Sequence, residues 1–85
     1  MRIFTEQPLV EYIDKYPETK TALQEWASVA KKSQWTSFAD VKESFADATI
    51  IGEQQYVFNL LGNRHQLIAV ILFPIQLISI KLIHK

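Results

Sequence analysis

The sequence has 85 residues, of which 48% are hydrophobic and none is cysteine. One domain over residues 1–85 is therefore expected, and the missing cysteines exclude disulfides, thiolate metal sites and cysteine nucleophiles, as is usual in a reducing cytoplasm. The formal net charge is zero, which excludes a surface that binds nucleic acid everywhere. Residues 50–85 carry three Lys or Arg and one acid, so any RNA site is expected in this half.

The N-terminal segment predicts a short strand and a helix. Residues 2–4 are a short apolar start that is typical of an edge strand, and Pro8 comes before any long apolar run, so no signal peptide is expected. Apolar residues from Leu9 to Tyr16 then recur at i, i+3, i+4 and i+7. This spacing predicts a helix that Thr5 caps and Pro17 ends.

Two further helices are predicted before residue 49. Residues 18–32 have an amphipathic pattern with two lysines in the last turn, where positive charge suits the helix dipole. Ser37, with Asp40 three residues later, predicts a capping box for a short third helix. The apolar positions of these two helices are Leu23, Trp26, Ala27, Ala30, Phe38, Val41 and Phe45.

After Ala48 the spacing changes from helical to strand-like. Strands are predicted at residues 49–51, 55–61, 67–73 and 76–83, and Gly62-Asn63 predicts a type II′ hairpin turn. The fold class is therefore α+β, with N-terminal helices packed on a C-terminal antiparallel sheet of three or four strands.

Residues 67–83 are apolar enough to resemble a membrane span, but we reject that interpretation. A span needs about 20 apolar residues, whereas this stretch has Pro74 at its middle and many β-branched side chains. Two buried strands joined at Pro74 explain it better. In the last strand, Ile78, Ile80 and Leu82 are expected on the core face, and Ser79 and Lys81 on the other.

Pairing of the last two strands predicts a small basic cluster at one end of their hairpin. Residues 64–66 and 82–84 come together there, which gathers Arg64, His65, His84 and Lys85. Cleavage of RNA without a metal needs a proton acceptor, a proton donor and cations that face the charged transition state. Histidine, lysine and arginine supply these groups, although a lone histidine at a strand end is often only a surface residue.

Aromatic side chains leave two interpretations open. Tyr56 and Phe58 are suited to stacking on unpaired bases, but core positions in a strand explain them better. Trp26 and Trp35 are suited to anchoring a protein partner, but tryptophan beside a helical apolar stripe is commonly core. No paired carboxylates, phosphate-binding glycine loop or metal cluster is present, so no metal and no cofactor are expected.

Four segments together resemble the HigB toxins of the RelE-like superfamily of messenger-RNA interferases. They are Trp35 to Lys42 (W-x-S-x-x-D-V-K), Ala48 to Gly52, Tyr56 to Leu60 (containing V-F-N) and Gly62 to Ile68, which begins with G-N. The resemblance covers nearly the whole chain. It implies a RelE-like fold and a bacterial, cytoplasmic toxin that cleaves messenger RNA, commonly on the ribosome, and so inhibits translation. It also implies a HigA-like helix-turn-helix antitoxin as partner.

The cluster and the resemblance together give the candidate site. The candidate catalytic residues are Arg64, His65 and His84. The candidate RNA-binding residues are Asn59, Asn63, Gln66, Lys81 and Lys85.

Two departures from the family pattern predict a weakened nuclease. Gln66 stands where the family usually has an arginine, and the sequence has His84-Lys85 where the family continues into T-H-x-E-Y-D. Loss of a charge that stabilises the phosphate costs on the order of several kcal/mol. Two alternatives stay open: a non-catalytic module of toxin-like fold that only binds a protein, and an unrelated α+β domain. Exposed strand edges also leave a homodimer open.

Overall fold

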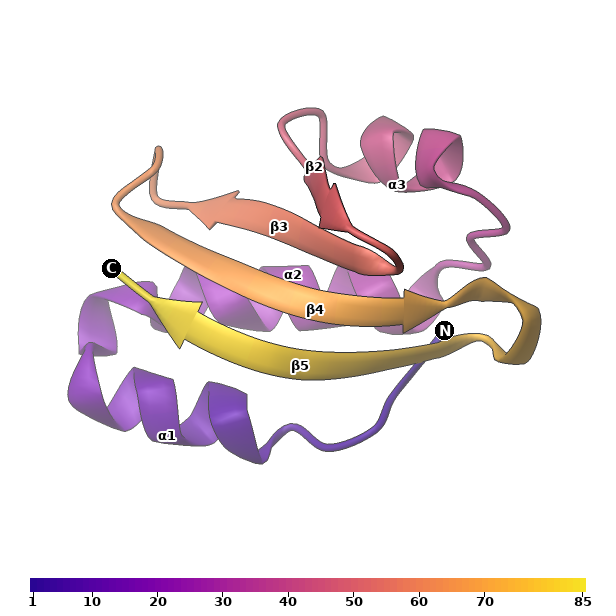
Figure 1. The fold of residues 1–85 in the computed structure, drawn as a ribbon. Helices are drawn as coiled ribbons and strands as arrows, with labels where there is room; N and C mark the ends of the chain where they lie inside the picture. The colour runs from indigo at the N-terminus through magenta and orange to yellow at the C-terminus, as the bar shows by residue number, and fades with distance from the viewer.

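The computed structural model describes all 85 residues, with the helices preceding most of a five-stranded sheet (Figure 1). The helices are α1 (Gln7–Lys15), α2 (Lys20–Lys32) and α3 (Phe38–Ser44), with 3-10 turns η1 (Pro17–Thr19) and η2 (Phe73–Ile75). The strands are β1 (Arg2–Ile3), β2 (Thr49–Gly52), β3 (Gln55–Leu60), β4 (His65–Leu72) and β5 (Leu77–His84). The predicted α+β class is confirmed.

The strand order is β1-β5-β4-β3-β2. Strands β2 to β5 pair antiparallel, as predicted, whereas β1 pairs parallel with β5 through Arg2 and Ile3, so the sheet is mixed. The N-terminal amine donates to carbonyls at the end of α2, including that of Ala30 at 3.1 Å. This positive group lies at a helix C-terminus, where charge of that sign is favourable, and it holds β1 at its edge of the sheet.

Two of the three predicted helix starts fall within one residue of the observed starts but differ in the cap. Thr5 Oγ1 accepts the N–H of Gln7 at 3.3 Å, although the N-cap residue is Glu6. At α3, Ser37 is the N-cap residue but makes no side-chain cap, so the predicted capping box is wrong. Asp40 instead accepts both the N–H and the hydroxyl of Thr36 at 2.9 Å, and these bonds hold its pKa below the ordinary 3.8.

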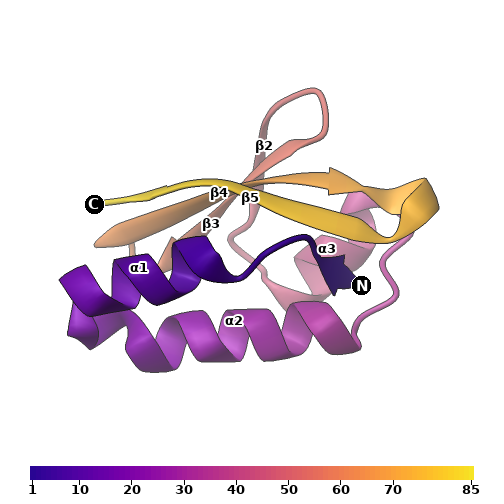
Figure 2. The same cartoon turned by 90° about the horizontal axis from the view of Figure 1, so that it is seen from below.

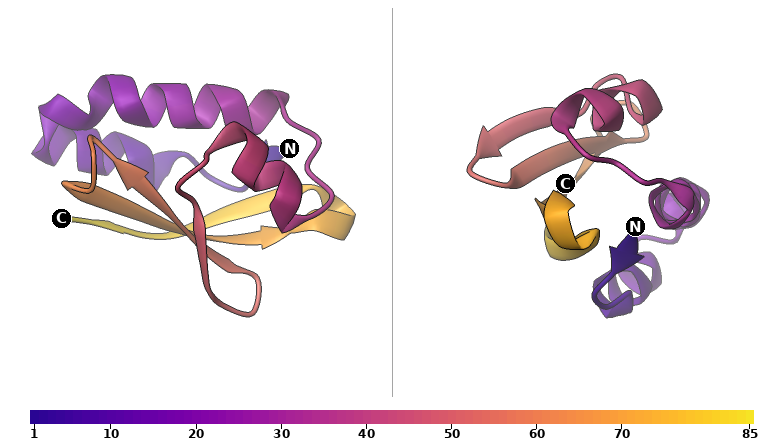
Figure 3. Two further views of the ribbon diagram at one scale, coloured as in Figure 1. Left: turned by 90° about the horizontal axis from the view of Figure 1, so that it is seen from above. Right: turned by 90° about the vertical axis from the view of Figure 1, so that its right-hand side faces the viewer.

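The hydrophobic core lies between the helices and one face of the sheet. Figure 2 shows α1 and α2 together on that face, and both views of Figure 3 place β2 on the far side of the sheet from α1. Along β4, the odd-numbered residues are buried toward the helices, and the even-numbered ones are half-buried on the opposite face. We call that opposite face, which neither α1 nor α2 covers, the open face.

Four aromatic residues, for which the sequence left both a binding role and a core role open, are core residues. Trp26 and Trp35 are 2% and 3% exposed, and the Trp26 ring lies 5.4 Å from that of Phe58. Tyr56 is also buried and stacks on Phe38 with 5.5 Å between ring centroids. These side chains are therefore neither partner anchors nor base-stacking platforms, because their surfaces are already used in packing.

The apolar stretch 67–83 forms most of β4, the turn η2 and most of β5, in agreement with the rejection of a membrane span. No helix of the protein has the length and apolar character needed to cross a bilayer.

The position of the turn between β3 and β4 was predicted correctly from the sequence, but the predicted type II′ is wrong. Gly62 and Asn63 both have positive φ, 61° and 79°, and the N–H of Arg64 donates to the carbonyl of Leu61 at 3.4 Å. Positive φ at both central residues is the type I′ pattern, whereas type II′ has it only at the first. The turn directs Arg64 to the start of β4, at the end of the sheet where β5 finishes (Figure 1).

Candidate functional site

A row of polar side chains crosses the open face at the C-terminal end of β5. The register pairs Asn59 with Gln66 and Gln66 with His84, and directly opposite residues of antiparallel strands share one face. Gln66 Nε2 donates to Asn59 Oδ1 at 3.2 Å. This hydrogen bond fixes the Gln66 amide between the other two residues, so we call Asn59, Gln66 and His84 the polar row.

His84 has a free proton acceptor in its neutral form. Its Nδ1 lies 2.9 Å from the carbonyl oxygen of Lys85. A carbonyl only accepts, so Nδ1 carries the hydrogen and Nε2 of the neutral ring is left with its lone pair. The ring is half-buried.

A β-bulge at Lys81 adds a cation to the open face and changes the predicted side-chain alternation. Ile68 pairs with Leu82 and Ala69 with Ile80, so Lys81 has no partner on β4. Its Nζ donates to Gln55 Oε1 at 3.3 Å. The extra residue reverses the alternation that follows it, and Leu82 is 51% exposed, so its predicted place on the core face is wrong.

His65 lies on the opposite face of the sheet from His84. It is 2% exposed, and its Nδ1 is 2.7 Å from the hydroxyl of Tyr12 in α1. Its Nε2 faces the Glu18 carboxylate at 3.6 Å, and the rings of Tyr12 and Tyr16 lie edge-on to it at 5.6 and 5.4 Å. The predicted catalytic role of His65 does not fit this burial, because the ring is enclosed by helix residues.

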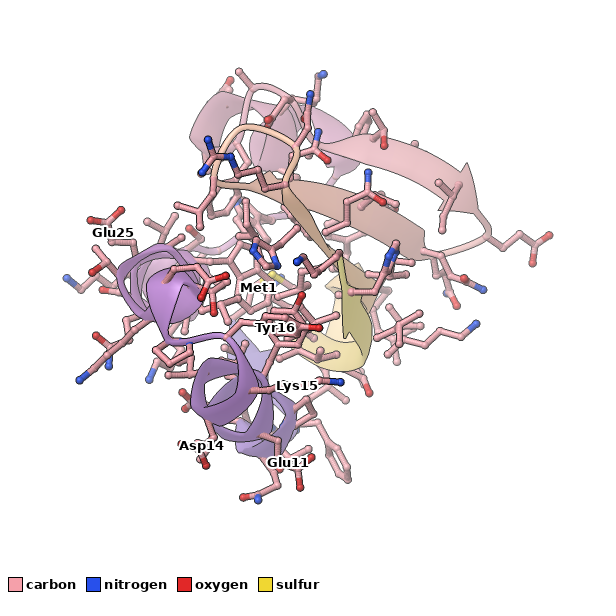
Figure 4. All side chains as sticks on the ribbon, turned by 90° about the vertical axis from the view of Figure 1, so that its left-hand side faces the viewer. Met1, Glu11, Asp14, Lys15, Tyr16 and Glu25 are labelled. Carbon is pink, nitrogen blue, oxygen red and sulfur yellow. The ribbon has the colours of Figure 1, made fainter.

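The predicted basic cluster is therefore divided between two faces. Arg64, His65 and Lys85 line one hollow of about 600 Å³ together with Glu18 and Leu61, whereas the register places His84 on the open face. Arg64 and Lys85 are exposed and form no ion pair, and Lys85 Nζ lies 5.3 Å from the centroid of the Tyr16 ring. Figure 4 looks at this end of the molecule and shows Tyr16 directed from α1 toward the sheet.

Tyr12, which lies at hydrogen-bond distance from His65, was not predicted from the sequence to lie at this site. Burial, followed by the neighbouring Tyr16 and Glu18, raises the pKa of Tyr12 above 10.0. The only signal in the sequence was a pair of tyrosines on the apolar face of a helix, where a buried hydroxyl needs a partner. That partner is 53 residues away in the chain, so spacing did not reveal it.

Another hollow has no ionisable side chain in its lining. This hollow of about 550 Å³ beside η2 is lined by Gln34, Thr36, Phe73, Pro74 and Gln76. The structure contains no group of three or more His, Cys, Asp or Glu side chains placed to hold a metal ion.

A comparison of the sequence with known protein families finds a match. Residues 19–85 match the HigB toxin family, described as the RelE-like toxic component of a toxin-antitoxin system. The chain belongs to this family. The match begins after α1, so Tyr12 and the helix that carries it lie outside the matched segment, whereas all three residues of the polar row lie within it. No curated protein matches the chain at a significant level.

Proposed function

We propose that this HigB-family toxin is a messenger-RNA interferase, an endoribonuclease that cleaves messenger RNA on the ribosome of a bacterial cytoplasm and so inhibits translation. The observation that supports the proposal is the polar row on the open face, with Lys81 on the same face nearer the other end of β3, where its Nζ donates to Gln55. A strip of polar and basic groups on an uncovered sheet face suits a single strand of RNA, whose bases and backbone are both accessible.

His84 is proposed as the general base. Its Nε2 takes the proton of a ribose 2′-hydroxyl, whose oxygen attacks the adjacent phosphorus while the bond from phosphorus to the 5′-oxygen breaks. The products are a 2′,3′-cyclic phosphate and a 5′-hydroxyl, which receives its proton from water or from the protonated histidine. Such proton transfer contributes typically about 10²–10⁴-fold to rate.

The remaining candidate residues are proposed to bind and orient the RNA. Lys81 faces the phosphate from the bulge, and the Asn59 and Gln66 amides hydrogen-bond ribose or base. Arg64, Asn63 and Lys85 extend the contact over the end of the sheet, where the two cations are exposed and unpaired. Gln66 supplies an amide where the family usually has a guanidinium, so the proposed enzyme is slow.

The antitoxin is proposed to be a HigA-like helix-turn-helix protein. Family membership supports an antitoxin partner in general, and the HigA type follows from the HigB resemblance of the sequence.

The decisive variant is Gln66→Arg. A guanidinium at this position faces the developing phosphate charge, and one such stabilising group is worth about 10²–10³-fold in rate. We expect Gln66→Arg to cleave a messenger that is being translated by purified ribosomes at least tenfold faster than the wild type, with primer extension as the measurement. The double variant Gln66→Arg/His84→Ala serves as the matched control and is expected to lose this gain. Absence of cleavage by both the wild type and Gln66→Arg would contradict the proposal.

A non-catalytic binding module is the second candidate, and the Gln66 amide favours it. The module binds the antitoxin but leaves RNA intact, even when Gln66→Arg is introduced and ribosomes are present. The same primer-extension assay therefore separates the two functions, because only the enzyme gains cleavage from the arginine.

A further inference from the structure

The edge strand β2 has unpaired backbone groups on its outer side and two exposed isoleucines. It is the last strand of the sheet and pairs only with β3, so one row of its N–H and C=O groups faces outward. All four residues are exposed, and Ile50 and Ile51 are 52% and 54% exposed. Soluble proteins usually protect such an edge with charge, proline or a covering element, because it is a template for another strand.

A register irregularity follows Ile50 in β2. Ile50 pairs with Tyr56, while the next pair is Gly52 with Gln55, so Ile51 is an extra residue without a partner on β3. Bulges bend a strand and limit the length of regular ladder that it offers. A short extended segment therefore fits β2, with main-chain hydrogen bonds for affinity and apolar side chains to cover Ile50 and Ile51.

The charges around β2 decide which kind of strand fits. Between residues 40 and 53 the chain carries four acids and one lysine. That lysine, Lys42, donates to the carbonyls of Ala46 and Ala48 at 2.7 and 3.2 Å. Asp47 and Glu53, both exposed, flank the strand at its two ends. Nucleic acid is repelled by such a surface, and a segment with lysine or arginine is attracted.

A second copy of this chain fits the edge poorly. Antiparallel pairing of two β2 strands places Asp47 of one copy near Glu53 of the other, and like charges that face each other across strands are destabilising. The views of Figure 3 show β2 turned away from α1 and α2, and β3 is the one strand of this chain that pairs with it.

We propose that the antitoxin, whose existence the proposed function requires, adds a short extended segment with alternating apolar and basic residues to the free edge of β2. The polar row lies on the open face near the end of β5, whereas β2 is the far edge strand. The antitoxin is therefore anchored on the toxin apart from the polar row, whereas Lys81 lies nearer to β2, because it bonds Gln55, the β3 partner of Gly52.

The test measures binding of the helix-turn-helix protein encoded beside the toxin gene, by isothermal titration calorimetry. We expect the double variant Ile50→Lys/Ile51→Lys to lose at least tenfold in affinity, because it removes the apolar surface and repels a basic segment. The control is Phe4→Lys, which places a single lysine on a 71% exposed residue beside the opposite edge strand, β1, and is expected to bind like the wild type.

A second pair of variants tests the charge. Asp47→Lys/Glu53→Lys is expected to weaken binding at least tenfold at low salt and less at high salt. Asp14→Lys/Glu25→Lys makes the same change in net charge on the exposed helix positions labelled in Figure 4, and it is expected to bind normally. Thermal unfolding of every variant confirms that the chain is folded before binding is compared.

Four outcomes overturn the proposal. They are no binding to the wild type, unchanged affinity in the β2 variants, equal loss in the control variants, and a wild-type dimer that the β2 variants abolish. A photo-crosslinking residue at position 51 that captures the antitoxin, while one at position 4 does not, supports it. These results are separable from the proposed nuclease, because failure to cleave RNA leaves the affinities unchanged and failure to bind leaves cleavage unchanged.

Discussion

The two histidines of this chain lie at the same end of one hairpin and have different surroundings. His65 begins β4 on the helix side, 2% exposed, with Tyr12 and Glu18 at its two ring nitrogens. His84 ends β5 on the open face, half-buried, with only a carbonyl at Nδ1. One residue of offset in a strand changes the face, so the same side chain packs against the helices at one position and lies on the uncovered face at the other.

Replacing His84 tests the chemical half of this comparison and has the largest expected effect. His84→Ala removes the proposed proton acceptor without disturbing a buried contact. We expect RNA cleavage to fall about 10²–10⁴-fold, measured in the Gln66→Arg background so that the starting rate is well above detection. The midpoint of thermal unfolding is expected to stay within a few degrees of the parent. Full cleavage by this variant would remove His84 from the mechanism.

Replacing His65 tests the structural half. His65→Ala leaves a cavity between β4 and α1 and leaves the Tyr12 hydroxyl without its partner, so we expect the free energy of unfolding to fall by about 2–4 kcal/mol. Urea denaturation followed by tryptophan fluorescence measures it, since Trp26 and Trp35 are buried in the core. His65→Leu fills most of the volume and is expected to lose less. If His65→Ala is as stable as the wild type, the ring is not a packing residue.

The difference between the two histidines was beyond the reach of the sequence, although the fold was largely within it. Helical spacing and the change of period after Ala48 predicted the order of the main elements, because each element has its own local pattern. The pairing of the last strands was also predictable, since Pro74 and the turn chemistry leave the two apolar runs no other arrangement. These predictions depend on neighbours within a few residues of one another.

Three of the errors depend on contacts that are distant in the chain or on one inserted residue. The bulge at Lys81 has no composition signal, and it reverses which residues of β5 face the core, so Leu82 was misplaced. The environment of His65 comes from α1, 53 residues away. The parallel pairing of β1 with β5 joins the two ends of the chain. A local pattern does not report such contacts, which is why the cluster was predicted as one site.

Removing one hydroxyl is a milder test of the contact between α1 and β4. Tyr12→Phe keeps the ring but leaves His65 Nδ1 buried without a hydrogen-bond partner. We expect the free energy of unfolding to fall by about 1–2 kcal/mol, less than in His65→Ala, because no cavity is formed. The double variant Tyr12→Phe/His65→Leu is expected to lose less unfolding free energy than the sum of the two single losses, since both partners are then apolar. Additive losses in this cycle would show that the two side chains are not coupled.

The smallest expected effect is a change of stability at alkaline pH. Burial raises the pKa of Tyr12 above 10.0, so the unfolded chain loses this proton at a lower pH than the folded chain does. The stabilisation from the protonated hydroxyl is therefore fully present below about pH 10 and is lost as the pH rises toward the pKa of the folded state. Lysines titrate in the same range, so the measurement is the difference in unfolding free energy between wild type and Tyr12→Phe. That difference is expected to shrink as the pH rises above about 10. A constant difference above about pH 10 would mean that burial protects the Tyr12 proton no better in the folded protein than in the unfolded chain.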